Sequence, residues 1–287
     1  FDYIDTTDSM DSIGATSGFQ VTAKHLDGEI ADITEGFFYG DQKGVGKNLK
    51  QKIAGNDNAL RRGKLYGTTL AATPEAYVQV LFKEFTNNAV DGQSFLVPNG
   101  SLAKQRVSNA GVTKDGRDLT QLTQKFFHGA VSFSQAARDY LSTDLSAKKG
   151  LNAQNETPYK PGKSYTSLEH HFDEGFGYFG AAVDYKNYTH TQIAKKLSVD
   201  TDNDGEISIQ SEMNLGLAVN SAKRDLGAMG GANLKNEAIT AFLQGRHLIT
   251  SKPANYKKYV VASANVALGA WEKTIASTAV HYINKTI

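Results

Sequence analysis

Apolar residues recur at steps of three and four along most of the chain after residue 66, which is the period of an α-helix. The clearest stretch runs over 118–140, where Asp118 precedes the apolar series and Gln121 follows three residues later, a capping-box spacing. The apolar series is Leu119, Leu122, Phe126, Ala130, Phe133, Ala137 and Tyr140. This spacing predicts a long helix with one face in the core.

Other segments have the same character, and polar loops separate them at 88–117 and 143–165. One begins at Thr73 as the N-cap, with Pro74 at the first helical position. The later predicted helices are 167–187, 190–198, 211–228, 233–249 and 255–285. Strands do not alternate with these helices, so a parallel sheet is not expected. The pattern predicts an all-α protein of packed helical bundles, with bundle halves at 67–150 and 164–287.

The first part of the chain has a different pattern. Residues 1–66 are rich in Gly, Asp and Thr and show weak periodicity, although GFQVTAKHL at 18–26 is typical of a short strand. We therefore expect an irregular N-terminal segment, 1–66, packed on a helical domain, 67–287.

Composition and charge narrow the classes of function. The 287-residue chain has a formal net charge of +1, which gives no electrostatic reason to expect a nucleic-acid partner. It contains no cysteine, which excludes disulfides and zinc–thiolate sites. No apolar run reaches the roughly 18 residues of a transmembrane helix. Because the chain begins at Phe1, we expect a mature chain from which a signal peptide has been removed.

Candidate chemistry is densest in SYTSLEHHFDEGFGYFG, residues 164–180. Thr166 and Glu169 have the spacing of a capping box, so we expect Glu169 to bond the Thr166 amide at the start of the helix. That role makes Glu169 a poor candidate for a metal ligand.

On the helical wheel, His171, Glu174 and Tyr178 lie together beside the apolar stripe. We predict that His171 and Glu174 converge near a helix–helix interface and that Tyr178 supports them, since His-x-x-Glu builds metal sites in helical bundles. His170 points away from the stripe but lies one turn from Glu174, so it is a further candidate ligand, and Asp173 lies on the other flank. The alternative is that His171 is a boundary residue hydrogen-bonded to Glu174 or Tyr178.

Two glycines stand inside this predicted helix, Gly175 and Gly177. Each costs about 1 kcal/mol relative to alanine in a helix interior. We expect close approach of another backbone or of a ligand to offset that cost. A further histidine, His281, lies to one side of the apolar stripe in the last helix, where it is a candidate additional ligand.

A second motif, DTDNDGEISIQSE, begins at residue 200 and follows the spacing of a calcium-binding loop. The predicted oxygen ligands are the carboxylates of Asp200, Asp202 and Asp204, the carbonyl of Glu206, and Ser208 through a water molecule. An EF-hand has a bidentate glutamate at its twelfth position, where this chain has Ser211, and Glu212 follows one residue later. We expect Glu212 to contribute from a shifted helix start; the alternative is an acidic loop with self-capping aspartates.

The stretch EHHFDEGFGYFG resembles the signature of the bacterial domain of unknown function 4856. It is also similar to the imelysin-like, iron-regulated proteins, whose motif is Gly-x-His-x-x-Glu. His171 and Glu174 match the His and Glu of that motif, while Glu169 stands at its Gly position. The resemblance covers about residues 60–287, through 125–136, 200–216 and 271–284 as well.

The resemblance implies an imelysin-like, all-helical and often lipid-anchored periplasmic protein, related to proteins of iron or other metal acquisition. We therefore expect a periplasmic or surface-anchored metal-binding protein that holds calcium and iron or zinc. One alternative is a metal-dependent, peptidase-like hydrolase. Another is a calcium-stabilised binding module whose partner is an outer-membrane receptor or other surface protein.

Overall fold

The computed structural model describes residues 52–54, 65, 67–90, 95–96, 106–107, 111–144, 149–209, 211–227 and 232–286. The short strand predicted at 18–26 and nearly all of the irregular segment 1–66 lie outside these residues. Contacts divide the chain into two compact units, one of Asn48–Val131 and one that includes Ser132–Ile287. The described residues are helical apart from turns, loops and one pair of two-residue strands, which confirms the prediction of an all-α protein.

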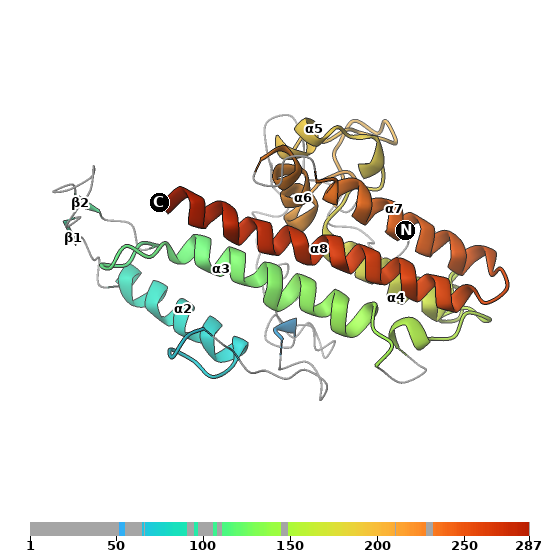
Figure 1. Ribbon diagram of the computed structural model, residues 1–287, viewed down its shortest axis with the longest axis horizontal. Helices are drawn as coiled ribbons and strands as arrows, with labels where there is room; N and C mark the ends of the chain where they lie inside the picture. Colours follow the sequence, from blue (N-terminus) through green and yellow to red (C-terminus); the bar gives the residue numbers. More distant parts are fainter. Residues whose placement is uncertain are drawn as a thin grey trace. The chain divides into compact units, whose positions relative to one another are not determined.

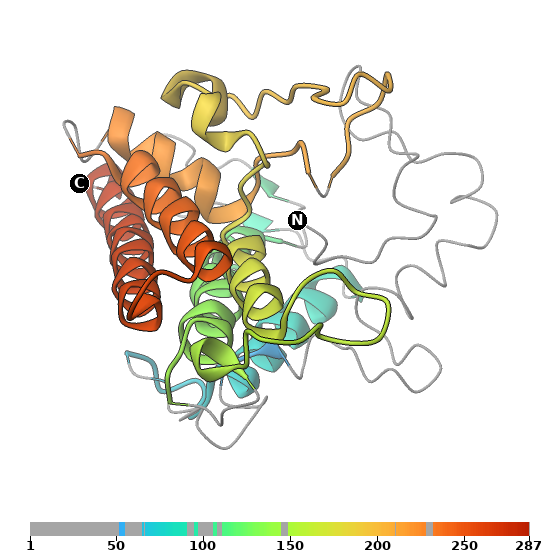
Figure 2. The same cartoon turned by 90° about the vertical axis from the view of Figure 1, so that its right-hand side faces the viewer.

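The larger unit is built on four helices, α4 (Ser167–Phe179), α6 (Gly216–Leu226), α7 (Leu234–Ser251) and α8 (Tyr256–Thr286). Helices α7 and α8 form an antiparallel pair, and α4 lies alongside α7 (Figures 1 and 2). The short helix α5 (His190–Ala194) packs on α6. Lys252 and Asn255 adopt positive φ angles of 48° and 59° where the chain turns from α7 into α8.

Aromatic rings fill the centre of this unit. The ring centroids of Phe176 and Phe242 lie 5.2 Å apart, and those of Phe179 and Trp271 also lie 5.2 Å apart. Phe172, Phe179 and Trp271 are almost completely buried. Burying one such side chain stabilises the fold by about 1.5–3 kcal/mol, so these rings fix α4 against α7 and α8.

Helix α4 ends earlier than predicted, at Phe179 rather than near residue 187. Gly180 follows with a left-handed φ of 85°, and its N–H donates to the carbonyl of Gly177. Because the chain leaves the helix there, Val183 is 40% exposed. Helix α5 also stops early, at Ala194. Helix α6 begins later than predicted, at Gly216.

The helix predicted over 118–140 is α-helical only in its first part, α3 (Leu119–Phe127). The side chain of Asp118 caps it by accepting from the Gln121 N–H, as predicted. Wider π-helical turns follow, η4 (His128–Phe133) and η5 (Ala136–Tyr140). The wider turns change which positions face inward, and Asp139 becomes buried, where it pairs with Lys149 at 2.5 Å.

The unit of Asn48–Val131 contains α2 (Pro74–Val90) and α3. Tyr77 on α2 packs edge-on against Phe126 on α3, with ring centroids 5.0 Å apart. Within the predicted loop 88–117, strands β1 (Phe95–Leu96) and β2 (Arg106–Val107) form a short antiparallel pair. No helix among the described residues is long and apolar enough to cross a membrane.

Gly180→Ala should destabilise the protein by about 2 kcal/mol, because an L-residue is strained at positive φ. A Cβ there would also lie 2.7 Å from the Leu215 carbonyl oxygen. Gly269→Ala is the matched control, since nothing lies within 4 Å of its added Cβ inside α8, and it should stabilise by about 0.5–1 kcal/mol. Urea unfolding of both variants measures the difference, and equal effects would contradict the role given to Gly180.

Candidate functional site

The first turn of α4 is organised by the predicted capping box. The Thr166 N–H donates to Glu169 Oε2 at 2.8 Å, and the Glu169 N–H donates to Thr166 Oγ1 at 3.2 Å. The other oxygen of Glu169 accepts from Arg246 Nη1 on α7 at 2.8 Å. Burial alone would raise the pKa of Glu169, but the hydrogen bonds from Thr166 and Arg246 hold it below its ordinary value. Glu169 is thus engaged as expected, at the helix start and in an ion pair.

Asp173 lies on the same flank of α4 as Glu169 and is also tied to α7. Its Oδ1 accepts from Arg246 Nε at 2.9 Å, and the residue is only 4% exposed. Burial raises the pKa of Asp173 to about 6, while Arg246 acts in the opposite direction. This pair connects the two helices and leaves the opposite side of α4 for the histidines.

Glu174 pairs with His170, which the sequence also places one turn away. His170 Nε2 lies 3.6 Å from Glu174 Oε1, an i, i+4 pair. The convergence of His171 on Glu174 stays a prediction, and helical side chains lean toward the N-terminus. The Glu174 side chain therefore reaches back over the turn that carries His170.

Two tyrosines from the loop before α4 cover His170. The ring centroid of His170 lies 4.2 Å from that of Tyr159 and 5.6 Å from that of Tyr165, both in stacked orientation. The loop folds back on itself, since the Tyr159 N–H donates to the Tyr165 carbonyl at 2.8 Å. The sequence signal for this cover is a turn at Pro161-Gly162 between two tyrosines, within the segment predicted as a polar loop.

His171 is buried on the other side of the same cluster and is 7% exposed. It makes a backbone hydrogen bond with Gly150, and its Nδ1 has no hydrogen-bond partner in the described structure. Burial lowers the pKa of His171 to about 4, and the nearby positive charges of His170 and Lys149 act in the same direction. His171 is therefore neutral at pH 7.

Tyr140 completes the surroundings of Glu174. Its ring stacks on Tyr178 with a centroid distance of 5.6 Å, and its side chain is hydrogen-bonded to Glu174. Burial, followed by the negative charge of Glu174, raises the pKa of Tyr140 far above its usual value. Tyr140 is thus a neutral phenol that donates to the carboxylate. Sequence reasoning placed it only on the core stripe, and Tyr178 supports the site through this ring as expected.

The arrangement brings an imidazole, a carboxylate and a phenol together around Glu174. Metal–nitrogen and metal–oxygen bonds are about 2.0–2.2 Å long, so two ligands of one ion stand roughly 3 Å apart. The 3.6 Å between His170 and Glu174 needs only a small adjustment to meet that spacing. Imidazole and carboxylate suit iron or zinc, so His170, Glu174 and Tyr140 form the donor set that could hold such an ion.

The acidic loop gathers the three predicted carboxylates. Ligand oxygens of Asp200, Asp202 and Asp204 all lie within 4.8 Å of one another, and across the described ranges no other three acidic or histidine side chains cluster in this way. Asp200 also accepts from the N–H groups of Asn203 at 2.6 Å and Gly205 at 2.9 Å. The Gly205 bond, followed by that of Asn203, lowers the pKa of Asp200.

Glu212 holds the two ends of this loop together. Its Oε1 accepts from the Thr201 hydroxyl at 2.6 Å and its Oε2 from the Ser208 N–H at 2.8 Å. Burial would raise the pKa of Glu212, but these hydrogen bonds hold it below its ordinary value. Glu212 is 1% exposed and does not belong to the carboxylate group, so its role as a calcium ligand stays a prediction.

The segment that leaves the acidic loop is bonded to the end of α4. The Leu215 N–H donates to the Gly180 carbonyl at 2.7 Å, and the Val183 N–H donates to the Ser211 carbonyl at 2.7 Å. The side chain of Asn214 accepts from the Ala182 N–H at 3.0 Å. The loop is thus attached to the helix that carries the histidines.

With both sites described, the chain can be compared with known proteins. The model of a domain of unknown function, DUF4856, matches residues 10–287. The chain belongs to the DUF4856 family. No curated protein and no solved structure matches it. The resemblance to DUF4856 is therefore confirmed, and the relation to imelysin-like proteins stays a prediction.

The structure of this DUF4856 chain separates His281 from the α4 site. Phe172 and Ser263 both lie against Gly245, and Phe179 contacts Trp271, so α4 and α8 run in the same direction. His281 is ten residues beyond Trp271, or about 15 Å farther along α8. His171 lies before Phe172, toward the opposite end. His281 therefore cannot join the α4 histidines in one site.

The structure also explains Gly175. A Cβ on this residue would lie 2.7 Å from the Leu141 side chain, so a leucine, rather than a backbone or ligand, occupies the space. The close approach was predicted, and its partner is a core side chain.

His171 should make the protein sensitive to acid. Its pKa of about 4 in the folded state lies below the ordinary 6.5, so the unfolded chain binds the proton more readily. Stability should fall as the pH drops from about 6.5 toward 4. His171→Gln should remove about 1–3 kcal/mol of that loss. Urea unfolding from pH 7 to pH 4.5 measures it, with His247→Gln, at an exposed position on α7, as the control. An unchanged pH dependence in His171→Gln would contradict this assignment.

Proposed function

We propose that this protein binds a transition metal on α4 and serves iron or other metal acquisition in the bacterial periplasm or at the cell surface. The observation that carries the proposal is the pairing of His170 with Glu174 at 3.6 Å, next to the Tyr140 phenol. The imidazole nitrogen of His170 and the phenol oxygen of Tyr140 thus both lie beside the Glu174 carboxylate. The resemblance of the α4 sequence to iron-regulated proteins supports the same class of function.

The surroundings of these donors also favour an ion. Tyrosine rings cover His170 on one side, and Tyr140 and Tyr178 stack beside Glu174. In the same cluster, the Nδ1 atom of His171 is buried and has no hydrogen-bond partner in the described structure. A low-dielectric cover strengthens the attraction between a cation and a carboxylate. The cover also restricts water, which competes for coordination positions.

Iron chemistry gives Tyr140 a particular role in this proposal. A ferric ion binds phenolate, and the pKa of Tyr140 in the metal-free protein is raised by burial and by Glu174. A bound cation would neutralise Glu174 and reverse that electrostatic effect. Binding would then release the phenolic proton, so the affinity for ferric iron should increase with pH.

We further propose that the acidic loop binds calcium. Three carboxylates within 4.8 Å repel one another, and an oxygen-seeking cation offsets that repulsion. Partial desolvation and the charges of Asp204 and Glu212 raise the pKa of Asp202, which reflects the same crowding. The ion's role would be structural, since the loop is attached to the end of α4.

The second candidate function, favoured by this carboxylate cluster, is a calcium-stabilised binding module. Its partner would be an outer-membrane receptor or another surface protein, and the α4 cluster would be internal structure only. Calcium without any transition metal in the purified protein would favour this candidate. Peptide hydrolysis by the metal-loaded protein would instead revive the hydrolase alternative.

His170→Ala and Glu174→Gln should each raise the Kd for iron or zinc by at least about 10- to 100-fold. Metal content after purification without chelators, followed by titration, measures the change. Tyr140→Phe keeps the ring and removes the phenol, so it should abolish the visible phenolate-to-iron absorption band. His247→Ala is the exposed control. Unchanged metal content in both His170→Ala and Glu174→Gln would refute the site, and a loss only in His171→Ala would restore the pair predicted from sequence.

Calcium should raise the melting temperature of the protein, and Asp200→Asn or Asp204→Asn should remove most of that rise. Glu206→Gln is the matched control, because it removes a charge from the same loop while keeping the carbonyl that is the predicted ligand. Thermal unfolding with calcium and with EDTA checks this. If Glu206→Gln loses the response as fully as Asp200→Asn, general charge and not ligation is responsible.

A further inference from the structure

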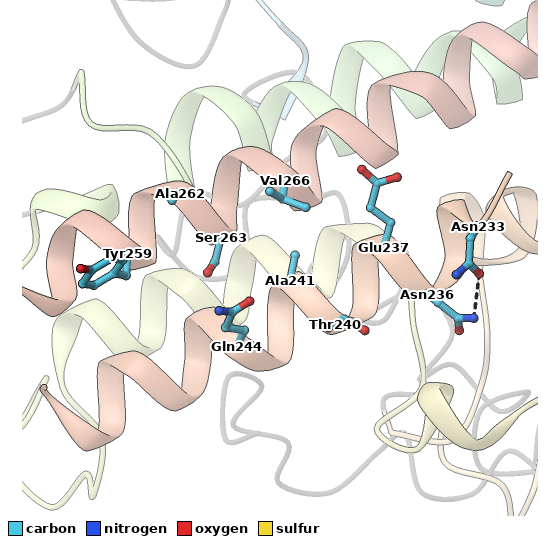
Figure 3. Close-up of a pocket in the computed structure, with 10 residues that line it drawn as sticks. All are labelled: Asn233, Asn236, Glu237, Thr240, Ala241, Gln244, Tyr259, Ala262, Ser263 and Val266. Atoms are coloured by element: carbon cyan, nitrogen blue, oxygen red, sulfur yellow. Dashed lines mark hydrogen bonds between the residues drawn. The ribbon is translucent and has the colours of Figure 1, made fainter.

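An open groove of about 530 Å³ lies between helices α7 and α8 (Figure 3). None of its lining residues belongs to the acidic loop. This volume is within the range of small-molecule sites. Ala241 and Ser263 are its most buried lining residues, and Thr240, Gln244, Tyr259 and Val266 are more exposed. The groove exists because the facing side chains in the seam between the two helices are short.

Ser263 is the most informative residue of the groove. It is only 6% exposed, yet its side chain makes no hydrogen bond to any described residue. Farther along α8, Thr274 and Thr278 instead donate to carbonyls of their own helix. Figure 3 shows the Ser263 hydroxyl pointing from α8 toward α7. The hydroxyl is therefore open to the groove, where a polar group of a bound molecule would pair with it.

The α7 side of the groove offers further open hydrogen-bonding groups. The side chains of Thr240 and Gln244, one turn apart, make no hydrogen bond within the described part of the chain. The lining contains one ionisable acid, Glu237, and Lys273 already pairs with it at 3.3 Å. The groove therefore has no uncompensated charge, which favours an uncharged ligand.

Two side chains of α8 add apolar surface to the groove, Tyr259 at one end and Val266 near its middle (Figure 3). Tyr259 is 53% exposed and Val266 is 47% exposed on α8. An exposed tyrosine ring is a flat apolar surface with a polar tip. Together the groove offers hydroxyls and an amide, each able to donate and accept, beside a flat ring.

We infer that this groove binds a neutral carbohydrate chain. Sugar hydroxyls donate and accept in the same manner as the open groups of Ser263, Thr240 and Gln244, and the C–H face of a sugar ring fits the Tyr259 ring. An extended peptide binds to a row of unpaired backbone N–H and C=O groups. The groove offers no such row, because these groups are already paired within α7 and α8. The inference is independent of the metal proposal, because none of its residues belongs to α4 or the acidic loop.

The test uses the whole protein and a panel of neutral hexasaccharides based on glucose, mannose, xylose and N-acetylglucosamine. At least one should bind in calorimetric titration. Gln244→Ala and Tyr259→Ala should each weaken that binding by about five- to tenfold. Ala262→Trp, at an exposed position in the groove, should abolish it. Ala276→Trp, at an exposed position of α8 outside the groove, should leave it unchanged.

Three results would overturn the inference. The first is that no hexasaccharide of the panel binds, and the second is that binding survives Ala262→Trp. The third is a dimer in sedimentation that Ala262→Trp dissociates and Ala276→Trp does not, which would assign the groove to a second copy of this chain. Thermal unfolding of each variant separates these outcomes from misfolding.

Discussion

The contact between the Phe172 ring and Gly245 determines where α4 lies on α7. A Cβ on Gly245 would overlap the ring, so only glycine permits this approach. With Phe172 fixed, Glu169 and Asp173 reach Arg246 on the same side of α4. His170 and Glu174 are then directed to the opposite side, toward the tyrosines of the preceding loop. This one packing contact therefore decides which side chains of α4 face α7 and which face the preceding loop.

The α4 cluster combines groups that cost free energy when buried alone. A buried polar atom without a partner costs about 1–3 kcal/mol, and His171 carries such an Nδ1 atom. Tyrosine rings pack well here and also supply a hydroxyl to Glu174. Proteins tolerate this unfavourable burial mainly where a ligand or a specific arrangement compensates for its free-energy cost.

Much of the fold could be predicted from local rules. The cap of α3 by Asp118, the capping box at Thr166 and the buried stripe of α4 depend on neighbours within one or two turns, and the structure has them. The end of α4 could not be predicted as well, because the left-handed Gly180 is held by Leu215 from a distant segment. The π-helical turns after Phe127 likewise break the period on which the stripe was based. The tyrosines that stack on His170 come from the loop before α4, which no helical wheel contains.

The attachment of the acidic loop to α4 has a thermodynamic consequence. The Gly180 carbonyl and the Val183 N–H are hydrogen-bonded to the segment that leaves the loop. A change that orders the loop therefore also orders the end of α4. An ion in one place and an ion in the other would then influence each other's affinity without any common ligand, and equally in both directions. Removing both proposed ions from a preparation would change two coupled binding equilibria, one on the acidic loop and one on α4. An affinity measured afterwards for one ion would describe a protein that lacks the other.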